Sequence, residues 1–343
     1  MKIQKAKIGI IGCGEMGLNH YKCIKKLSDL FELVFICDTS DERLARITDC
    51  IIKYSDWNIL RYDIEDKRLE CDGIIIATPS ELHFTMAATL SPYSKILVEK
   101  PVCLRYEDTD RLNKNVMAGH TMVYHPVIEH IKNSFEHNDF IPVKFYLRRW
   151  NRGKPTRESV LWRLAPHDIS IFLYLTRDLW NDVPYEKAIL HSISTTLIHR
   201  ESWEKNSLIW NDSLDFSLKY GEDRYCNISV SREAQITDRT LTIIGDDYNG
   251  NYKVYRFDET NKLYSEYLNG EKLSISYKDF EYKEDPLTEE LRSFYSFIIY
   301  NTVPRTNNDH FIQVGAILQD VEDEIERLKL KNKISERRVW EFE

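Results

Sequence analysis

Two patterns of apolar spacing divide the chain. In the first third, short apolar runs that read as buried strands alternate with segments in which apolar residues recur every three or four positions, as in helices. The expected strands cover 7–11, 32–37, 73–77 and 95–98, and the expected helices cover 15–27, about 41–53, 81–90 and 106–115. Strands that alternate with helices predict an α/β fold with a parallel, doubly wound sheet.

The pattern changes near Gly119. From about 185 to 283, runs such as DSLDFSLKY and CNISVSRE alternate apolar and polar residues between Asn, Asp and Gly turns, which is typical of antiparallel strands. Segments 287–300 and 309–330 read as helices, and we interpret the charged run ERLKLKNK at the end of the second as a solvated face. We therefore expect two domains, residues 1–119 and residues 120–343.

Three glycines in IGIIGCGEMG, residues 8–17, lie between the first expected strand and the first expected helix. A G-x-G-x-x-G pattern is weak evidence by itself, but a strand-to-helix turn is the context in which it binds a dinucleotide. Gly12 would permit the tight turn, Gly14 the approach of a pyrophosphate, and Gly17 close packing of helix on strand. The helix N-terminus would offer N–H groups to the phosphates. Cofactor contacts are expected from Gly12, Cys13, Gly14, Glu15, Met16 and Gly17.

Asp38 follows the second expected strand, about 20 residues after the last glycine, where a carboxylate can accept hydrogen bonds from the ribose hydroxyls. This position favours NAD over NADP, because Asp38 would repel a 2′-phosphate and neither Thr39 nor Ser40 is an arginine; Arg43 lies a helical turn further on. The alternative is that Asp38 caps the next helix. Ala77, Thr78 and Pro79 close the third strand at its carboxyl end, where such sheets bind ligands.

Composition and charge exclude several classes of protein. With 343 residues and 42% apolar content the chain can bury a sizeable core, and its net charge of −8 argues against a nucleic-acid partner. No signal-peptide pattern and no membrane-length apolar run is present, so we expect a cytoplasmic protein without a membrane partner. Seven cysteines without a C-x-x-C pair suggest neither a disulfide framework nor a zinc site. We expect no metal.

Six motifs occur in order along the chain: GCGEMG, ATPSELH at 77–83, VEKP at 98–101, GHTMVYHP at 119–126, LWRLAPHDI at 161–169 and DPLTEELRSF at 285–294. Together they resemble the glucose–fructose oxidoreductase and inositol dehydrogenase (Gfo/Idh/MocA) family. The resemblance implies an N-terminal Rossmann domain that binds NAD and a C-terminal α+β domain whose large, mainly antiparallel open sheet often forms the subunit interface. It also implies sugar or cyclitol substrates held between the domains.

The resemblance assigns roles to single residues. Lys100 matches the lysine of the E-K-P segment, and His167 matches the histidine of the helix that faces the nicotinamide; these are the expected catalytic residues. Glu99, Lys100 and His83 are expected near the cofactor, and Tyr124 near the substrate. Oxidation of a secondary alcohol needs a group that takes the hydroxyl proton, which Lys100 or His167 can provide. Pro101 would hold Lys100 in extended geometry, and Pro166 places His167 in the expected first turn of a helix.

One position departs from the family pattern. Many relatives carry an aspartate four residues before the active-site histidine, and here that residue is Arg163, which cannot act as a base. Asp168 is adjacent in sequence but about 100° around a helix from His167, so it is an imperfect substitute. Either Lys100 and His167 act alone, or the site binds without turnover.

A basic segment, RRWNRGKPTRESVLWR at 148–163, has a local charge of +5 and leads into His167. It is either a solvated loop or part of a site for an anionic substrate, in which arginines bind phosphate or carboxylate and Trp150 or Trp162 stacks on a ring. The expected substrate contacts are Tyr124, Trp150, Arg152, Arg163, His167 and Asp168. A nucleotide-activated sugar fits best, followed by a sugar acid or sugar phosphate.

Three hypotheses arise from these patterns. The first is an NAD-dependent sugar oxidoreductase, with NADP the less favoured cofactor. The second is an enzyme that uses NAD without net redox change during glycoside cleavage or epimerisation. The third is a non-catalytic NAD- and sugar-binding regulator. Tyrosines and isoleucines on the exposed face of the second sheet favour a homodimer or homotetramer.

Overall fold

The computed structural model describes residues 4–137, 140–152, 159–180, 185–197, 209–247, 249–280 and 283–339. The chain divides into two compact units. The first comprises Met1–Pro126 and Glu284–Gly315, and the second comprises Val127–Lys283 and Ala316–Glu343. No helix among the described residues is both long enough and apolar enough to cross a bilayer.

The first unit is built on a six-stranded sheet in the order β3-β2-β1-β4-β5-β6, and all its strands are parallel. This doubly wound α/β fold confirms the predicted class, and the topological switch point lies between β1 and β4. The strands are β1 (Ala6–Ile11), β2 (Phe31–Cys37), β3 (Ile52–Tyr54), β4 (Gly73–Ile76), β5 (Lys95–Glu99) and β6 (Val116–Gly119). The helices after them are α1 (Glu15–Lys26), α2 (Asp41–Ala45), α3 (Trp57–Glu65), α4 (His83–Leu90) and α5 (Tyr106–Thr109).

Three of these elements were not predicted. The expected helix near 41–53 ends at Ala45, and the chain then forms the short edge strand β3 and the helix α3. Asp56 caps α3 by accepting the N–H of Asn58, a start signal that the apolar pattern alone does not reveal. The strand β6 is a four-residue buried run that pairs with β5.

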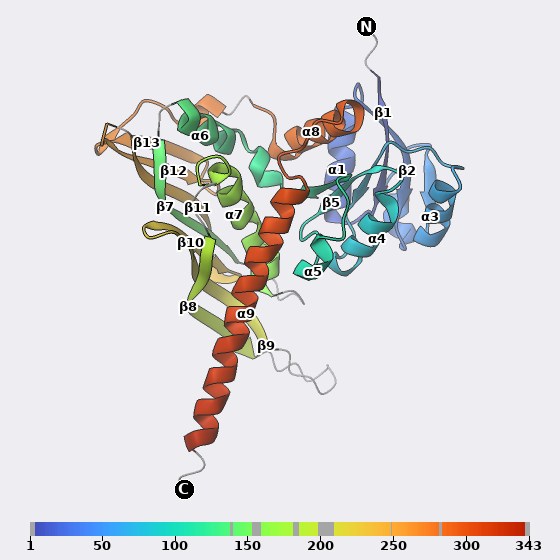
Figure 1. The fold of residues 1–343 in the computed structure, drawn as a ribbon. Helices are drawn as coiled ribbons and strands as arrows, with labels where there is room; N and C mark the ends of the chain where they lie inside the picture. Colours follow the sequence, from blue (N-terminus) through green and yellow to red (C-terminus); the bar gives the residue numbers. More distant parts are fainter. Residues whose placement is uncertain are drawn as a thin grey trace. The chain divides into compact units, whose positions relative to one another are not determined.

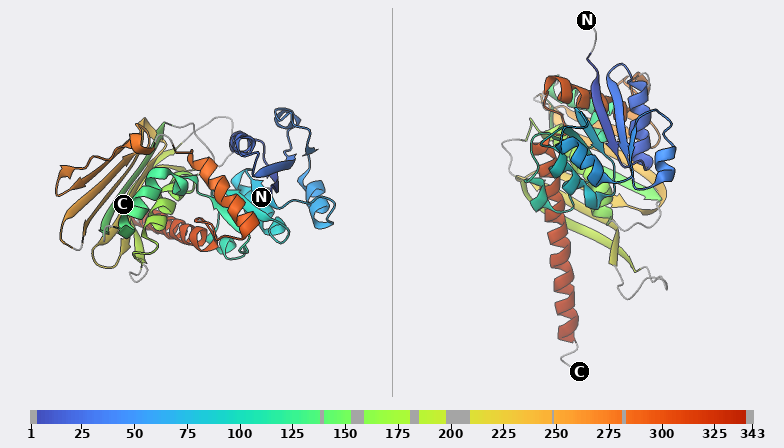
Figure 2. Two further views of the ribbon diagram at one scale, coloured as in Figure 1. Left: turned by 90° about the horizontal axis from the view of Figure 1, so that it is seen from above. Right: turned by 90° about the vertical axis from the view of Figure 1, so that its right-hand side faces the viewer.

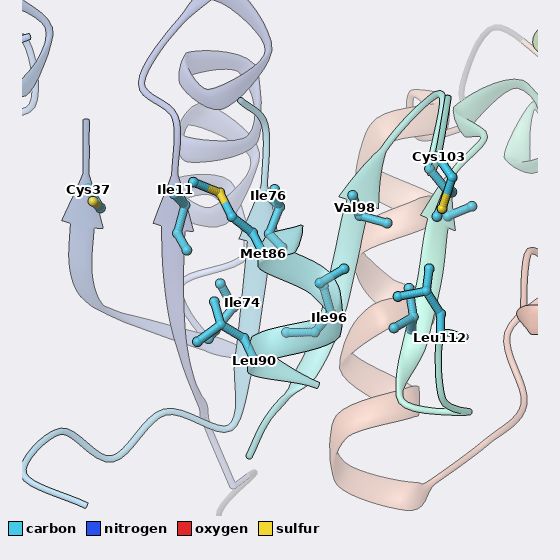
Figure 3. Packing of buried hydrophobic residues seen from close by; sticks show 14 of the residues in the cluster. Ile11, Cys37, Ile74, Ile76, Met86, Leu90, Ile96, Val98, Cys103 and Leu112 are labelled. Carbon is cyan, nitrogen blue, oxygen red and sulfur yellow. The ribbon is translucent and has the colours of Figure 1, made fainter. Parts of the chain in front are cut away.

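The core of the first unit joins the sheet to the helices on one of its faces. Figure 3 shows Met86 and Leu90 of α4 directed at side chains of the central strands, such as Ile74 and Ile96. These residues are buried, so the parallel strands read as continuous apolar runs rather than as alternating ones.

The helix α8 (Pro286–Tyr300) returns to the first unit although it lies far along the sequence. Asp285 caps it by accepting the N–H of Thr288, and its buried face packs on α1, β1 and β5. A Cβ on Gly73 would lie 2.5 Å from Ile298, which shows how closely helix and sheet approach. The expected division after residue 119 placed this helix in the second domain, because a sequence pattern does not reveal which core an amphipathic helix joins.

The second unit is built on an eight-stranded sheet in the order β14-β13-β12-β11-β7-β10-β9-β8 (Figure 1). The pairing of β7 with β10 is parallel and the other pairings are antiparallel. This confirms the prediction of a mainly antiparallel sheet. The strands are β7 (Phe140–Arg152), β8 (Tyr185–Leu197), β9 (Ile209–Tyr220), β10 (Arg224–Ser231), β11 (Glu233–Asp247), β12 (Tyr252–Asp258), β13 (Leu263–Leu268) and β14 (Glu271–Lys272).

Helices cover one face of this sheet. The helices α6 (Pro126–His137) and α7 (Val160–Thr176) pack on it, whereas no helix of the described residues covers the opposite face (Figure 2). We call this uncovered face of the eight-stranded sheet the open face. The division between the units falls within the last helix, α9 (Asn308–Val339).

Candidate functional site

The glycine loop follows β1 directly and leads into α1. Gly12 has φ +95°, and a Cβ there would lie 2.4 Å from the carbonyl oxygen of Ala77, so only glycine fits. A Cβ on Gly17 would lie 1.8 Å from the carbonyl oxygen of Gly12. A Cβ on Gly14 would meet nothing within 4 Å, which leaves open space over the backbone at the start of α1. This cradle fits a pyrophosphate.

Asp38 lies at the end of β2 and is tied to this loop. Its Oδ2 accepts the N–H of Cys13 at 2.7 Å, and its Oδ1 accepts the N–H of Ser40 at 2.9 Å. The N-cap of α2 is Ser40, whose side chain accepts the N–H of Arg43, so Asp38 does not cap that helix. Thr39 lies between these two residues. Asp38 therefore holds the glycine loop in shape at the point where a ribose would bind.

The turn after β4 lies beside the glycine loop, as the contact of Gly12 with Ala77 shows. His83 faces two carbonyl oxygens in this region, that of Pro101 at 2.7 Å from Nδ1 and that of Thr78 at 2.8 Å from Nε2. It therefore joins the turn of Thr78 and Pro79 to the chain after β5. At its expected position near the cofactor, His83 thus holds two backbone segments together.

Lys100 follows β5, and the Lys100–Pro101 peptide bond is cis. The Lys100 side chain is half-buried. Beside it in sequence, Glu99 is buried and contacts His20 Nε2 at 2.8 Å. Burial opposes ionisation of Glu99, but the hydrogen bond with His20 and the charge of Lys100 outweigh it and hold the pKa of Glu99 below its usual range.

Two further buried groups interact with the charges of Lys100 and Glu99 and were not among the expected site residues. His120 follows β6 and is buried, and burial together with the charge of Lys100 lowers its pKa to about 3. Glu290 of α8 is fully buried and its Oε2 accepts a hydrogen bond from Thr121 at 3.1 Å. Burial, assisted by the charge of Glu99, raises the pKa of Glu290 well above its usual range. An acid on the apolar face of the DPLTEELRSF segment is the sequence signal that could have revealed it.

Tyr124, an expected substrate contact, is buried in the first unit. Its hydroxyl lies 3.2 Å from Thr306 Oγ1, and the Arg305 guanidinium lies over its ring at 5.3 Å. Burial raises the pKa of Tyr124 to about 12. The hydroxyl therefore has a partner within its own unit.

The helix α7 carries His167, Asp168 and Arg163 in the second unit. It begins at Val160 with Ser159 as its N-cap, and Pro166 lies in its interior. The prediction that Pro166 opens the helix is wrong, because the apolar face begins one and a half turns earlier. His167 is partly exposed and Arg163, one turn before it, is exposed.

Asp168 belongs to a buried ion-pair cluster and not to an open site. Arg149 of β7 lies 3.0 Å from its carboxylate and also reaches Glu259, 3.5 Å away, which in turn accepts a hydrogen bond from Arg239. Burial raises the pKa of Asp168, although Arg149 opposes the shift. The cluster fixes α7 to the sheet at the residue next to His167.

The basic segment 148–163 is not a continuous loop. Its first part completes β7, residues 153–158, with Lys154 and Arg157, lie outside the described part, and its last part is α7. Arg148 pairs with Asp238 at 2.9 Å, so part of the local positive charge is neutralised. Arg152 is the last residue of β7.

Trp150 and Trp162 make contacts within the second unit. Trp150 Nε1 donates to Ser229 Oγ at 2.8 Å, and the Arg148 guanidinium lies over its ring at 4.4 Å. Because Arg149 faces α7, Arg148 and Trp150 point to the opposite side of β7, the open face. Trp162 is buried and donates to Glu322. Trp150 thus lies on the other side of the sheet from the helix that carries His167.

The expected site residues therefore form two groups. Those of the cofactor loop and Lys100 gather at the carboxyl ends of β1, β2, β4 and β5 in the first unit, whereas Arg163, His167 and Asp168 share α7 in the second. Among the residues that the structure describes, no group of three or more His, Cys, Asp or Glu could hold a metal ion.

Comparisons with known proteins agree with this geometry. Residues 6–125 match the model of an oxidoreductase family with an NAD-binding Rossmann fold, GFO_IDH_MocA. This N-terminal segment, about a third of the chain, therefore matches the NAD-binding domain of the Gfo/Idh/MocA family that the motifs predicted.

The curated relatives match only part of the chain. A glycosyl hydrolase family 109 protein of Shewanella baltica is 32% identical in an alignment of 138 residues that covers 36% of this chain and 30% of that protein. An α-N-acetylgalactosaminidase of Shewanella oneidensis is 30% identical over 138 residues, with the same coverage. The matched part is thus less than a third of the length of these relatives.

Solved structures match nearly the whole fold. The UDP-N-acetylglucosamine 3-dehydrogenase GnnA from Acidithiobacillus ferrooxidans has a TM-score of 0.72 at 18% identity, covering 92% of this chain and 96% of its own. The WlbA dehydrogenase from Bordetella pertussis, in complex with NADH and UDP-GlcNAcA, has a TM-score of 0.71 at 18% identity, covering 94% and 98%. At such identities the likeness concerns the fold.

Proposed function

We propose that this chain is an NAD-dependent oxidoreductase that transfers hydride to or from a carbinol carbon of a sugar, in particular a nucleotide-activated or otherwise anionic sugar. The observation that carries the proposal is the cradle at the switch point: the open space over Gly14 and the loop held by Asp38. NAD bound there supplies the hydride acceptor or donor. Gly12, Cys13, Glu15, Met16 and Gly17 would hold its pyrophosphate, and Asp38 its adenosine ribose.

Side chains of this chain would transfer the proton of the substrate hydroxyl. In this proposal Lys100 exchanges a proton with the substrate hydroxyl and His167 acts as the second acid or base. The half-buried position of Lys100 supports its part, because an ammonium beside a bound nicotinamide cation would more readily lose its proton. Asp168 positions α7 through Arg149 and takes no proton itself.

The substrate class rests on charge. Arg163 is exposed one turn before His167, and a guanidinium is suited to a phosphate or carboxylate of the substrate. Two structural neighbours are described as a UDP-N-acetylglucosamine 3-dehydrogenase and as a dehydrogenase in complex with UDP-GlcNAcA, which supports a nucleotide-activated sugar here. Arg163→Ala should then weaken binding of UDP-sugars more than that of neutral sugars, and equal losses would reject the anionic class.

The test of the reaction is the absorbance of reduced nicotinamide with NAD and a panel of UDP-sugars, sugar acids and sugar phosphates. We expect turnover that falls at least about 100-fold in Lys100→Met while NAD binding, followed by calorimetry, is retained. Lys114→Ala, an exposed lysine of the same unit, is the control. If Lys100 and His167 serve the same proton, Lys100→Met combined with His167→Asn will be no slower than the slower single variant. Multiplicative losses would contradict a shared role.

Two other functions remain distinct outcomes of this test. The names of the curated relatives favour glycoside cleavage without net redox change. Such an enzyme would release nitrophenol from a nitrophenyl N-acetyl-α-galactosaminide in the presence of NAD, and no NADH would accumulate. Arg163 in place of the usual aspartate favours a regulator, which would bind NAD and turn over none of the sugars.

We also propose that the open face of the eight-stranded sheet binds a second copy of this chain. This face contains a hollow of about 650 Å³ lined by charges of both signs, which include Arg148, Arg256, Asp215 and Asp258. Two copies related by a two-fold axis can pair opposite charges across such a surface. Sedimentation velocity should show a dimer or tetramer that Tyr146→Lys dissociates and Tyr93→Lys, equally exposed on the first unit, does not.

A further inference from the structure

Arg43 reaches the carboxylate on which the choice between NAD and NADP depends. Its Nη1 lies 3.6 Å from Asp38 Oδ2, close enough for an ion pair but too far for a hydrogen bond. Asp38 is almost fully buried, whereas about half of the Arg43 side chain is exposed (51%). The guanidinium is therefore loosely held at the rim of the ribose site.

The neighbouring cations are engaged elsewhere. Arg46 pairs with Glu42 at 2.7 Å. Lys53 donates to the carbonyl oxygens of Leu44 and Ile47. Among the described cations of segment 38–54, Arg43 is thus the one directed at Asp38.

The hydrogen bonds of Asp38 leave room for either ribose. Each carboxylate oxygen can accept two hydrogen bonds. Oδ1 has the N–H of Ser40 and keeps one position for a ribose hydroxyl, while Oδ2 has the N–H of Cys13 and the nearby guanidinium. Two N–H donors and one guanidinium together offset the charge by which Asp38 would repel a phosphate.

We propose that Arg43 is a specificity-determining residue that admits the 2′-phosphate of NADP to the adenosine-ribose site, so that this chain binds both dinucleotides. The proposal rests on dinucleotide binding at the glycine loop, as proposed above. With NAD, the ribose hydroxyl donates to Asp38 Oδ1 and Arg43 stays where it is. With NADP, the guanidinium turns by rotation of its exposed side chain and binds the phosphate through two N–H groups.

Binding to the full chain tests this without turnover. Calorimetry with NAD, NADP, 5′-AMP and 2′,5′-ADP should give dissociation constants for NAD and NADP within about tenfold of each other in the wild type. Arg43→Ala should weaken NADP and 2′,5′-ADP at least about tenfold and change NAD and 5′-AMP less than about threefold. Arg43→Lys should keep part of the NADP affinity. Arg46→Ala, at the C-cap of the same helix and equally exposed, should change none of the four.

Two results would overturn the proposal, and only the second would also overturn the proposed function. A wild type that binds NAD but discriminates against NADP by more than about 100-fold, with the ratio unchanged in Arg43→Ala, removes the role of Arg43 and leaves the proposed function intact. A wild type that binds neither dinucleotide removes both.

Discussion

Two clusters of buried charged groups, one in each unit, differ in how completely their polar atoms are hydrogen-bonded. In the second unit, Arg149 and Asp168 lie 3.0 Å apart and share a cluster with Glu259. In the first unit, Glu290 and His120 are buried as deeply, yet Glu290 Oε1 and His120 Nδ1 have no hydrogen-bond partner among the described residues. A buried polar atom without a partner is costly and persists where water or a ligand completes it.

This difference indicates which of the two clusters has capacity for a ligand. The two groups with unfilled positions are linked electrostatically to Lys100 and Glu99, because burial and the charge of Lys100 lower the pKa of His120, and burial and the charge of Glu99 raise the pKa of Glu290. The ion-pair cluster of the second unit instead saturates Asp168. We infer that the buried cluster of Glu99, His120 and Glu290 can accept further hydrogen bonds from a ligand or water, whereas the cluster under α7 holds that helix in place.

The largest effect on cofactor binding is expected in the glycine loop. Gly17→Ala places a Cβ where the carbonyl oxygen of Gly12 lies, so the loop cannot keep its shape. We expect a loss of NAD affinity of at least about 100-fold and a free energy of unfolding lower by more than about 2 kcal/mol. Calorimetry and urea unfolding measure the two.

Gly14→Ala is the matched variant. Its Cβ would enter open space, so the fold should keep its stability to within about 1 kcal/mol while NAD binding weakens, because the methyl group occupies the approach of the pyrophosphate. Unchanged NAD affinity in Gly14→Ala would show that the open space over this residue is not where the cofactor lies.

The next effect is expected when the ion-pair cluster of the second unit is broken. Arg149→Leu leaves the Asp168 carboxylate buried without its cation, and we expect a loss of about 3–5 kcal/mol in the free energy of unfolding. Arg148→Leu, the adjacent residue, removes a half-exposed pair with Asp238 and should cost less than about 1 kcal/mol. Similar losses in the two variants would mean that the cluster is not what holds α7.

The sequence predicted the glycine loop of the first unit more accurately than the helix α7 of the second. The glycine loop and Asp38 could be predicted because their geometry is set within about 30 residues of chain by a strand, a turn and a helix. The start of α7 was misplaced because Pro166 reads as a first-turn residue when the apolar face before it is not weighed.

Long-range partners could not be predicted in either unit. Arg149 and Asp168 are 19 residues apart, and Thr121 and Glu290 are 169 residues apart. Nothing in the spacing of a single sequence pairs such residues. The basic segment was interpreted as one surface because its strand was not recognised. Residues 148–152 belong to β7, and side chains alternate along a strand, so Arg148 and Arg149 lie on opposite faces of the sheet.

The last prediction compares how the free energy of unfolding depends on pH through two buried glutamates, Glu290 of the first unit and Glu266 of the second. Burial, with Glu99 nearby, raises the pKa of Glu290, so above about pH 4.5 the unfolded chain loses a proton that the folded chain keeps. Stability relative to Glu290→Gln should therefore fall as pH rises, by up to about 1.4 kcal/mol per pH unit.

Glu266 of the second unit should behave in the opposite way. Burial opposes its ionisation, but hydrogen bonds from His130 and Tyr264 and the charge of Lys253 outweigh burial and lower its pKa. Below about pH 4.5 the unfolded chain takes up a proton that the folded chain does not, so stability relative to Glu266→Gln should be lost as pH falls.

Urea unfolding of the wild type and both variants between pH 3.5 and 8 measures these differences. The two difference curves should bend in opposite directions, one above and one below about pH 4.5. A flat curve for Glu290→Gln would mean that Glu290 is ionised in the folded chain, which requires a cation or donor at its Oε1. That result would remove the contrast between the units, because Glu290 would then be satisfied in the same way as Asp168.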